Sequence, residues 1–309
     1  MTALHPEAEE IARRFSEAGL RPFCELTPAE ARAQVGAMRS AMADGGSPAA
    51  AAEALVVEGS GARVPVSLYA PAVPARGVIV FAHGGGWVVG APADADALCR
   101  RLVASTGCVV ASVDYRLAPE HVFPAAVDDL FDVTVWAAER WPGLPLVVAG
   151  ESAGGNLAAA VALRAAEGRA GLIDGQVLVY PVADCDFDTP SYRAHGSSAF
   201  LTREDMQWFW DHYAPDGLRT HPWASPRRAD RLDGVAPAVL VLAGQDPLHD
   251  EGAGYAEVLR AAGVAVAVLD YDDLPHGFLS MLGALGAAER PYEEVAAEIV
   301  RLVETARHA

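Results

Sequence analysis

The stretch Leu144-Pro145-Leu146-Val147-Val148-Ala149-Gly150-Glu151-Ser152-Ala153-Gly154 runs from apolar residues into a serine flanked by glycines. The short apolar run predicts a buried strand, and a helical pattern begins directly after the serine. Such a turn exposes the serine in a strained conformation, and glycines two residues away on either side avoid clashes with the neighbouring backbone. The pattern therefore predicts that Ser152 is a nucleophile at the end of a strand.

The competing interpretation of this stretch is an ordinary glycine-rich turn, for instance one that binds phosphate. A Walker-type phosphate loop requires a lysine directly after its glycines. The sequence contains no lysine, so that type of loop is excluded.

A second glycine-rich segment, His83-Gly84-Gly85-Gly86, also follows an apolar run directly. Glycine lets main-chain N–H groups converge on one point without obstruction by side chains. The N–H groups of Gly84 and Gly85, together with that of Ala153, are predicted to form an oxyanion hole. A flexible turn is the alternative, but a triple glycine between a histidine and Trp87 is a more specific signal.

A nucleophilic serine needs a histidine that accepts its proton and a carboxylate that orients this histidine. His276 follows the last predicted strand, and Asp246 directly follows the predicted strand at residues 239–242. The order Ser152, Asp246, His276 is the order used by hydrolases built on an open parallel sheet. These three residues are the predicted catalytic triad.

Other acids and histidines compete for the same roles. Asp270, Asp272 and Asp273 form a charged loop, and one of them could replace Asp246 as the partner of His276. Acids at positions 250 and 251 suit the first turn of the next helix, where the helix dipole stabilises negative charge. The histidine at position 249 is expected to be solvated. His83 is expected to orient the glycines rather than to accept a proton.

The pattern along the chain predicts strands that alternate with helices. Short runs rich in β-branched residues, separated by helical stretches, are typical of buried parallel strands covered by helices on both faces. The expected strands span residues 64–69, 78–81, 109–113, 146–148, 177–179, 239–242 and 264–269. The expected helices span residues 94–105, 124–140, 153–167 and 251–262. An open, mostly parallel sheet of the α/β class follows.

Two further segments are expected to be helical. Residues 7–42 form the first, with a good helix start at Thr27-Pro28-Ala29-Glu30 and a break at residues 44–48. Residues 184–225 form the second, which lacks a convincing strand and is rich in aromatic residues. It is either a helical excursion packed on the sheet or a lid over a substrate pocket. Its position in the chain favours the lid, because insertions at the carboxyl edge of a sheet carry function.

The composition limits the classes of partner. The chain has 309 residues, 52% of them hydrophobic, and a formal net charge of −18, which opposes binding to nucleic acid or to an anionic membrane. No apolar run is long enough for a membrane span or a signal peptide. Four cysteines without metal-ligand spacing indicate free thiols, so no metal or other cofactor is expected. A cytoplasmic location is the prediction.

These motifs together resemble the hormone-sensitive-lipase family of bacterial esterases. The resemblance runs from about residue 64 to the C-terminus and rests on His83–Trp87, Asp114–Glu120, Gly150–Leu157, Asp246–Leu248 and His276–Phe278. It implies an α/β-hydrolase fold with an eight-stranded, mostly parallel sheet and a helical cap. The cap would comprise residues 1–45 and 184–225, and the catalytic domain residues 46–183 and 226–309. Glu151 stands where the family often has aspartate.

The resemblance also implies the activity. A serine carboxylesterase acting on short- to medium-chain acyl esters, with a small-molecule ester as substrate, is the leading hypothesis. An amide or lactone hydrolase would use the same residues. A non-catalytic ligand-binding protein, as the plant gibberellin receptors are, is the rival from another class. Those receptors lack the catalytic histidine, whereas His276 is present here.

Two finer expectations concern association and the substrate pocket. Members of the family often dimerise through the last strand, here residues 264–270, so a homodimer is a hypothesis. The triple glycine is associated with tolerance of bulky alcohol groups. The candidate pocket-lining residues are Trp87, Phe200, Leu201, Trp208 and Phe209. Packing in a core is the commoner fate of such side chains.

Overall fold

A single sheet of eight strands, in the order β1-β2-β4-β3-β5-β6-β7-β8, organises the chain. The computed structural model describes residues 2–42 and 52–308. The strands are β1 (Glu53–Glu58), β2 (Arg63–Tyr69), β3 (Val78–Ala82), β4 (Val109–Val113), β5 (Leu146–Glu151), β6 (Gly175–Val179), β7 (Ala238–Gln245) and β8 (Val266–Pro275). β1, β2 and β4 pair antiparallel, and all pairs from β4 to β8 are parallel. The expected mostly parallel, eight-stranded sheet is confirmed.

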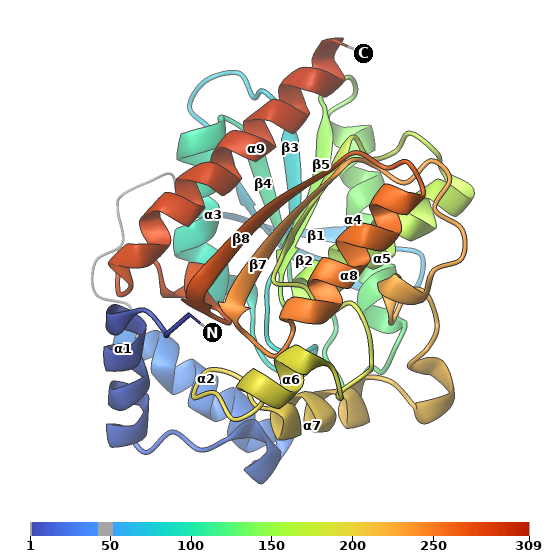
Figure 1. Ribbon diagram of the computed structural model, residues 1–309. Coiled ribbons are helices and arrows are strands. Elements are labelled where there is room, and N and C mark those ends of the chain that lie inside the picture. Colours follow the sequence, from blue (N-terminus) through green and yellow to red (C-terminus); the bar gives the residue numbers. More distant parts are fainter. Residues whose placement is uncertain (1, 43–51, 309) are drawn as a thin grey trace.

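The central strands are apolar because they are covered on both faces. All residues of β3, β4, β5 and β6 are buried. Figure 1 shows α4 (Ala125–Arg140), α5 (Ala153–Gly168) and α8 (His249–Ala261) on one face of the sheet, and α3 (Asp96–Thr106) and α9 (Glu289–His308) on the other. Two hydrophobic clusters, one on each side of the sheet, result from this arrangement.

The two ends of the sheet differ from the sequence-based expectation. β1 was not expected, because its apolar run at residues 54–57 is short and four of its six side chains are exposed. β8 extends to Pro275, so the acidic residues expected in a loop, Asp270, Asp272 and Asp273, belong to a strand. Cross-strand pairing with β7 holds this segment extended in spite of its charge.

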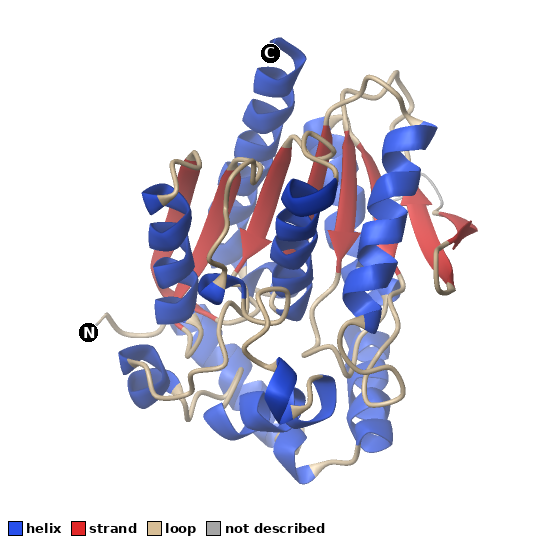
Figure 2. Cartoon of the chain, turned by 90° about the vertical axis from the view of Figure 1, so that its right-hand side faces the viewer, coloured by secondary structure: helices blue, strands red, loops and turns tan. Residues whose placement is uncertain are grey.

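A helical layer lies at the carboxyl end of the parallel strands (Figure 1). It consists of α1 (Pro6–Glu17), α2 (Pro28–Met42), α6 (Pro190–His195) and α7 (Arg203–Tyr213). Figure 2 shows these helices as a group distinct from those on the two sheet faces. A short 3₁₀ turn at Phe23–Glu25 packs against α7, and the N–H of Cys24 donates to the Asp205 carboxylate at 2.9 Å. The two helical segments of the sequence therefore meet in space.

The first helical segment, expected at residues 7–42, is not one continuous helix. Two helices replace it, and the second begins at the expected Thr27-Pro28-Ala29-Glu30 signal. There the Thr27 N–H donates to the Glu30 carboxylate at 2.8 Å, and the Glu30 N–H donates to the Thr27 hydroxyl at 3.3 Å. The expected break at residues 44–48, and the junction of the expected cap and catalytic domain at residues 45 and 46, lie outside the described residues.

Candidate active site

Ser152 occupies the sharp turn between β5 and α5. Its backbone torsions are φ 54° and ψ −120°, a region that residues other than glycine rarely adopt. The N–H of Ser152 donates to the carbonyl of Val179 on β6 at 2.8 Å, and its carbonyl accepts from the N–H of Asn156 at 3.0 Å. Bonds on both sides thus hold a strained serine at the carboxyl end of the sheet.

The flanking glycines are required by close backbone contacts. A Cβ atom at Gly154 would lie 2.1 Å from the carbonyl oxygen of Ala82, at the end of the neighbouring strand β3. A Cβ atom at Gly150 would lie 2.3 Å from the carbonyl oxygen of Gly154. Both distances are far inside van der Waals contact, so only glycine fits these two positions.

A chain of hydrogen bonds connects Ser152 with His276 and Asp246. His276 Nε2 lies 3.0 Å from the Ser152 hydroxyl, and His276 Nδ1 lies 2.6 Å from Asp246 Oδ2. The second oxygen of Asp246, a fully buried residue, accepts from the N–H of Leu248 at 2.9 Å. When Nδ1–H donates to the carboxylate, Nε2 is left as the acceptor for the serine hydroxyl. The three residues follow the ends of β5, β7 and β8, which bring them together.

The competing acids lie elsewhere. The Asp270 carboxylate is 3.1 Å from His249 Nε2, on the first turn of α8. This hydrogen bond raises the pKa of His249 to about 9, which outweighs the opposite effect of its partial burial. The expectation of a solvated His249 in a loop is therefore wrong. Its side chain is 26% exposed and bridges the first turn of α8 and the outer strand β8.

The two acids that follow His249 do more than respond to the helix dipole. Asp250 accepts from the N–H of Ser191 at 2.8 Å, which joins α8 to the helical layer at α6. Glu251 is fully buried and accepts from the N–H of Ala183 at 3.0 Å. Burial raises the pKa of Glu251 well above its ordinary value.

The glycine loop (residues 84–90) lies beside the serine turn. A Cβ atom at Gly84 would touch the side chain of Glu151 at 3.4 Å, so the loop and the turn are in contact. Gly85 has φ 118°, and a Cβ atom there would lie 2.2 Å from the carbonyl oxygen of Val89. Ala153 is buried at the first position of α5, next to the serine. Gly84 and Ala153 therefore lie beside Glu151 and Ser152 of the serine turn, and Gly85 follows Gly84 in the glycine loop.

His83 lies behind the glycine loop. Its ring stacks on Tyr115 with a centroid distance of 4.3 Å, and Nδ1 is 2.7 Å from the carbonyl oxygen of Gly84. Burial lowers the pKa of His83 to about 4, so the ring is neutral at neutral pH. These contacts suit a side chain that supports the loop.

Glu151 is a site residue whose contacts the sequence did not predict. Its Oε2 atom accepts hydrogen bonds from the hydroxyls of Tyr180 at 2.8 Å and Ser280 at 2.7 Å. The Tyr180 ring in turn packs on the His276 ring with centroids 4.8 Å apart. A single carboxylate thus joins the serine turn to the segment that carries His276. No sequence signal marks these partners, because they are 29 and 129 residues away.

The five candidate pocket residues are in different environments. Trp87, Leu201 and Phe209 are buried, and the Trp87 ring stacks on Tyr213 at 4.0 Å. Trp208 is partly buried beside Phe23. Phe200 lines a cavity of about 200 Å³, and its other lining residues are Leu4, Ala194, His195, Ser197, Ser198, Ala199 and Gln245. Of the five, three are thus packed into a core, and Phe200 faces open space.

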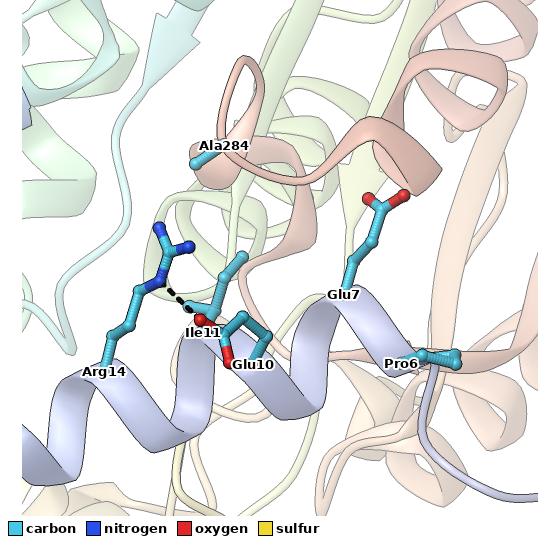
Figure 3. Close-up of a pocket in the computed structure, with 6 residues that line it drawn as sticks. All are labelled: Pro6, Glu7, Glu10, Ile11, Arg14 and Ala284. Carbon is cyan, nitrogen blue, oxygen red and sulfur yellow. Dashed lines mark hydrogen bonds and ion pairs between the residues drawn. The ribbon is translucent and has the colours of Figure 1, made fainter.

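A second cavity, of about 350 Å³, lies against α1. Figure 3 shows its lining side chains on α1 beside Ala284, with an ion pair between Arg14 and Glu10. None of its lining residues belongs to the hydrogen-bonded chain of Ser152. Among the described residues, no group of histidine, cysteine, aspartate or glutamate side chains is arranged to hold a metal ion. In the same part of the chain, no helix is long and apolar enough to cross a membrane.

Comparisons with known proteins identify the fold and the family of the chain. The profile of a family described as having the alpha/beta hydrolase fold matches residues 79–280. Carboxylic ester hydrolase LipN of Mycobacterium tuberculosis is 41% identical over 250 residues, which cover 76% of this chain and 66% of that protein. The crystal structure of a thermostable esterase from Pseudomonas putida superposes with a TM-score of 0.93 at 33% identity and covers 98% of both chains.

A relative with a different role is also similar. The gibberellin receptor GID1A of Arabidopsis thaliana is 36% identical over 215 residues, which cover 65% of this chain and 62% of the receptor. The match to receptors and esterases alike reflects one shared fold. The chain belongs to the hormone-sensitive-lipase-like family of α/β-hydrolases.

Proposed function

We propose that this chain is a serine carboxylesterase that hydrolyses short- to medium-chain acyl esters through an acyl-enzyme. The observation that carries the proposal is the unbroken hydrogen-bonded chain from Ser152 through His276 to the buried Asp246. The names of the esterase relatives support the same chemistry.

The reaction begins when Ser152 Oγ attacks the ester carbonyl carbon while His276 Nε2 accepts the hydroxyl proton. The carbonyl oxygen becomes an oxyanion, which accepts hydrogen bonds from the N–H groups of Gly84, Gly85 and Ala153. His276 then returns the proton to the leaving alcohol. Asp246 orients the imidazole and stabilises its charged form.

The second half of the reaction repeats these steps with water. His276 removes a proton from a water molecule, which attacks the carbonyl carbon of the acyl-enzyme. Collapse of the second tetrahedral intermediate releases the carboxylic acid, and the proton on His276 returns to Ser152 Oγ. No cofactor takes part in this scheme.

We propose further that residues 1–45 and 184–225 act as a cap that limits the substrate, and that the remaining residues form the catalytic domain. Contacts between the two helical segments support this division. The cavity at Phe200 has no lining residue from the Ser152–His276–Asp246 chain, so it does not single out Phe200 as a substrate contact. We also infer a homodimer paired through β8, which is an edge strand of the sheet. We infer a cytoplasmic location as well, because all four cysteines are free thiols.

A non-catalytic receptor is the rival function, and the position of His276 argues against it. The imidazole lies within hydrogen-bond distance of both Ser152 and Asp246, which binding alone does not require. An amide or lactone hydrolase would use the same atoms, so these substrates belong in the test.

The test compares the wild type with Ser152→Ala on p-nitrophenyl esters from acetyl to palmitoyl, and on a matched amide and lactone. Loss of the nucleophile is expected to reduce kcat/KM by about 10⁴-fold or more. Ser16→Ala, an exposed serine on α1, is the control and should behave as the wild type. The wild type should prefer acyl chains of short to medium length and react with a fluorophosphonate probe.

Two results would contradict the proposal. Retention of more than about a tenth of the activity by Ser152→Ala would remove the nucleophile assignment. A preference for the longest acyl chains would indicate a lipase instead.

A further inference from the structure

Four residues of the glycine loop (residues 84–90) have positive φ, and strain arises at the one that is not glycine. Gly85, Gly86 and Gly90 have φ values of 118°, 56° and 97°. Trp87 also has a positive φ, of 61°, although its side chain is large and fully buried. A tryptophan in this conformation costs free energy, and it persists only where the surroundings impose it.

Aromatic side chains of α7 pack against the glycine loop. The Trp87 ring stacks on Tyr213 with centroids 4.0 Å apart and planes 4° from parallel, and Trp210 packs against it at 5.1 Å. The ring of Phe209 fills the space beside Gly86, where a Cβ atom would lie 2.1 Å from it. Helix α7 therefore covers the loop from the side of the helical layer.

Arg32 on α2 makes hydrogen bonds to the glycine loop and to the neighbouring segment. Its Nε donates to the carbonyl of Val88 at 2.8 Å, and its Nη2 donates to the carbonyl of Ala118 at 2.8 Å. The same guanidinium pairs with both oxygens of Glu120, at 2.6 and 2.8 Å. One side chain of the N-terminal segment thus joins the glycine loop to the segment at residues 118–120.

These bonds continue to the carbonyl of Gly85, the residue whose N–H is one of the expected oxyanion donors. The N–H of Val89, in the same peptide unit as the carbonyl that Arg32 binds, donates to the carbonyl of Gly85 at 2.9 Å, and the N–H of Ala118 donates to the carbonyl of Trp87 at 2.9 Å. Arg32 thus bonds to the peptide unit that follows Val88 and to the one that precedes Pro119. A shift of the first unit would rotate the Gly85–Gly86 peptide, which adjoins the peptide that carries the N–H of Gly85.

The charge of this contact persists over the working pH range. Hydrogen bonds from Arg32 lower the pKa of Glu120 to about 2, and a guanidinium stays protonated in proteins. Its planar fork can serve several acceptors at once, which a lysine ammonium on a flexible stem does less well.

We propose that Arg32 is a positioning residue for the oxyanion hole, and that helix α2 acts through it to hold the glycine loop in its strained, donor-presenting conformation. The inference rests on the proposed esterase function, because the loop matters only if an oxyanion forms there. The hydrogen bonds of Arg32 go to Val88, Ala118 and Glu120 and not to the triad, so it is proposed to act through the loop.

The experiment compares Arg32→Ala and Arg32→Lys with the wild type by two measurements. The first is kcat and KM for p-nitrophenyl acetate. The second is the inhibition constant of an alkyl trifluoromethyl ketone, whose adduct with Ser152 places an oxyanion in the hole. Arg32→Ala should lower kcat by about 10- to 100-fold with KM changed by less than about threefold. The inhibition constant should rise by a similar factor, because the adduct resembles the transition state.

Arg21→Ala is the matched control. Arg21 belongs to the same N-terminal segment and is exposed, and its guanidinium donates to the Glu25 carbonyl at 2.6 Å. It should leave both measurements unchanged. For Arg32→Lys, kcat and the inhibition constant should lie between those of the wild type and of Arg32→Ala. One ammonium can bond to some, but not all, of the oxygens that the guanidinium binds.

A merely structural role for Arg32 predicts a different result. The melting temperature would fall, while kcat per folded molecule and the inhibition constant would stay within about twofold of the wild type, and that outcome overturns the inference. If Arg32→Ala does not fold, the same two measurements on Glu120→Gln test the inference. A parallel change of about threefold in kcat and in the inhibition constant supports the inference, and an unchanged inhibition constant refutes it. Failure of the wild type itself to hydrolyse esters would instead refute the proposed function.

Discussion

At Gly154 the backbone of the serine turn passes so close to the end of β3 that no side chain fits. The hypothetical Cβ atom would lie 2.1 Å from the Ala82 carbonyl oxygen and 2.5 Å from that of His83. His83 in turn begins the segment that leads into the glycine loop. A single glycine therefore sets the distance between nucleophile and expected oxyanion donors.

Gly154→Ala is predicted to separate these two elements. The added methyl group meets backbone atoms rather than a flexible side chain, so the turn or β3 must move. We expect kcat/KM to fall by about 100-fold or more, since displacements of about 1 Å at a reacting group have effects of this size. Ester hydrolysis and thermal unfolding are the measurements.

Gly168→Ala at the other end of α5 is the control for this substitution. A Cβ atom there meets nothing within 4 Å, and its φ is not positive. Activity should be unchanged, and stability should rise by about 0.4–1 kcal/mol because alanine restricts the unfolded chain. Equal activity of the two variants would show that the close contact at Gly154 is unimportant.

At the scale of elements, the loop that carries Asp246 is held from two directions. His249 bonds to Asp270 on β8, and Asp250 bonds to the N–H of Ser191 at the start of α6. Helix α8 thus begins at a junction with the edge of the sheet and with the helical layer. Because Asp246 precedes this junction by three residues, the junction limits how far the carboxylate can move.

The junction is predicted to weaken at alkaline pH. The pKa of His249 is raised to about 9 in the folded protein, mainly by its bond to Asp270, from an ordinary value of 6.5. A group whose pKa is raised by folding stabilises the folded state fully below its unfolded pKa. This stabilisation is lost as the pH rises from about 6.5 through 9. The change should be on the order of 1 kcal/mol, because solvent screens a partly exposed pair.

The measurement is the difference in free energy of unfolding between the wild type and His249→Gln at several pH values. Taking the difference removes the effect of other titrating groups. The difference should be largest near pH 6 and should vanish above pH 10. A constant difference over this range would show that the charge of His249 does not stabilise the junction.

Elements buried on both faces were the ones that the sequence predicted best. The apolar runs of β3, β4 and β6 matched their strands to within two residues, because burial on both faces demands an apolar run. β1 and the acidic part of β8 could not be predicted in this way. Their side chains are partly exposed, and only pairing with a neighbouring strand makes them extended.

At the scale of the whole molecule, β8 forms one edge of the sheet. The side chains of Val266, Ala267, Val268 and Leu269 on this strand are all partly exposed. An apolar edge strand offers unpaired N–H and carbonyl groups to another chain. The edge of β8 could therefore pair with a second copy of this chain in the homodimer that we infer.

Sedimentation should give a dimer of twice the 32.3 kDa chain mass. Val268→Lys should shift the equilibrium toward the monomer, because lysine on an edge strand opposes pairing and two copies would face each other. Val56→Lys, an exposed valine on the opposite edge strand β1, is the control and should leave the dimer intact. A monomeric wild type at micromolar concentration would refute the homodimer.

The sequence by itself determined which residues carry the chemistry and where they stand on their own elements. The motifs around Ser152, Gly84–Gly86, Asp246 and His276 are local, since each depends on a few adjacent residues and on the strand before them. Tertiary structure decided how these residues meet. His276 and Ser152 are 124 residues apart, and their contact exists only because β5 and β8 end at the same edge of one sheet.

Tertiary structure alone also selected the supporting partners. Glu151 with Ser280, His249 with Asp270, and Arg32 with the glycine loop are pairs that no spacing rule relates. A charge or a hydroxyl in a sequence specifies what it can bond to, but not which of many such groups packing will place beside it. This is why the reaction class could be inferred from the residues, whereas the means of holding them in place required the fold.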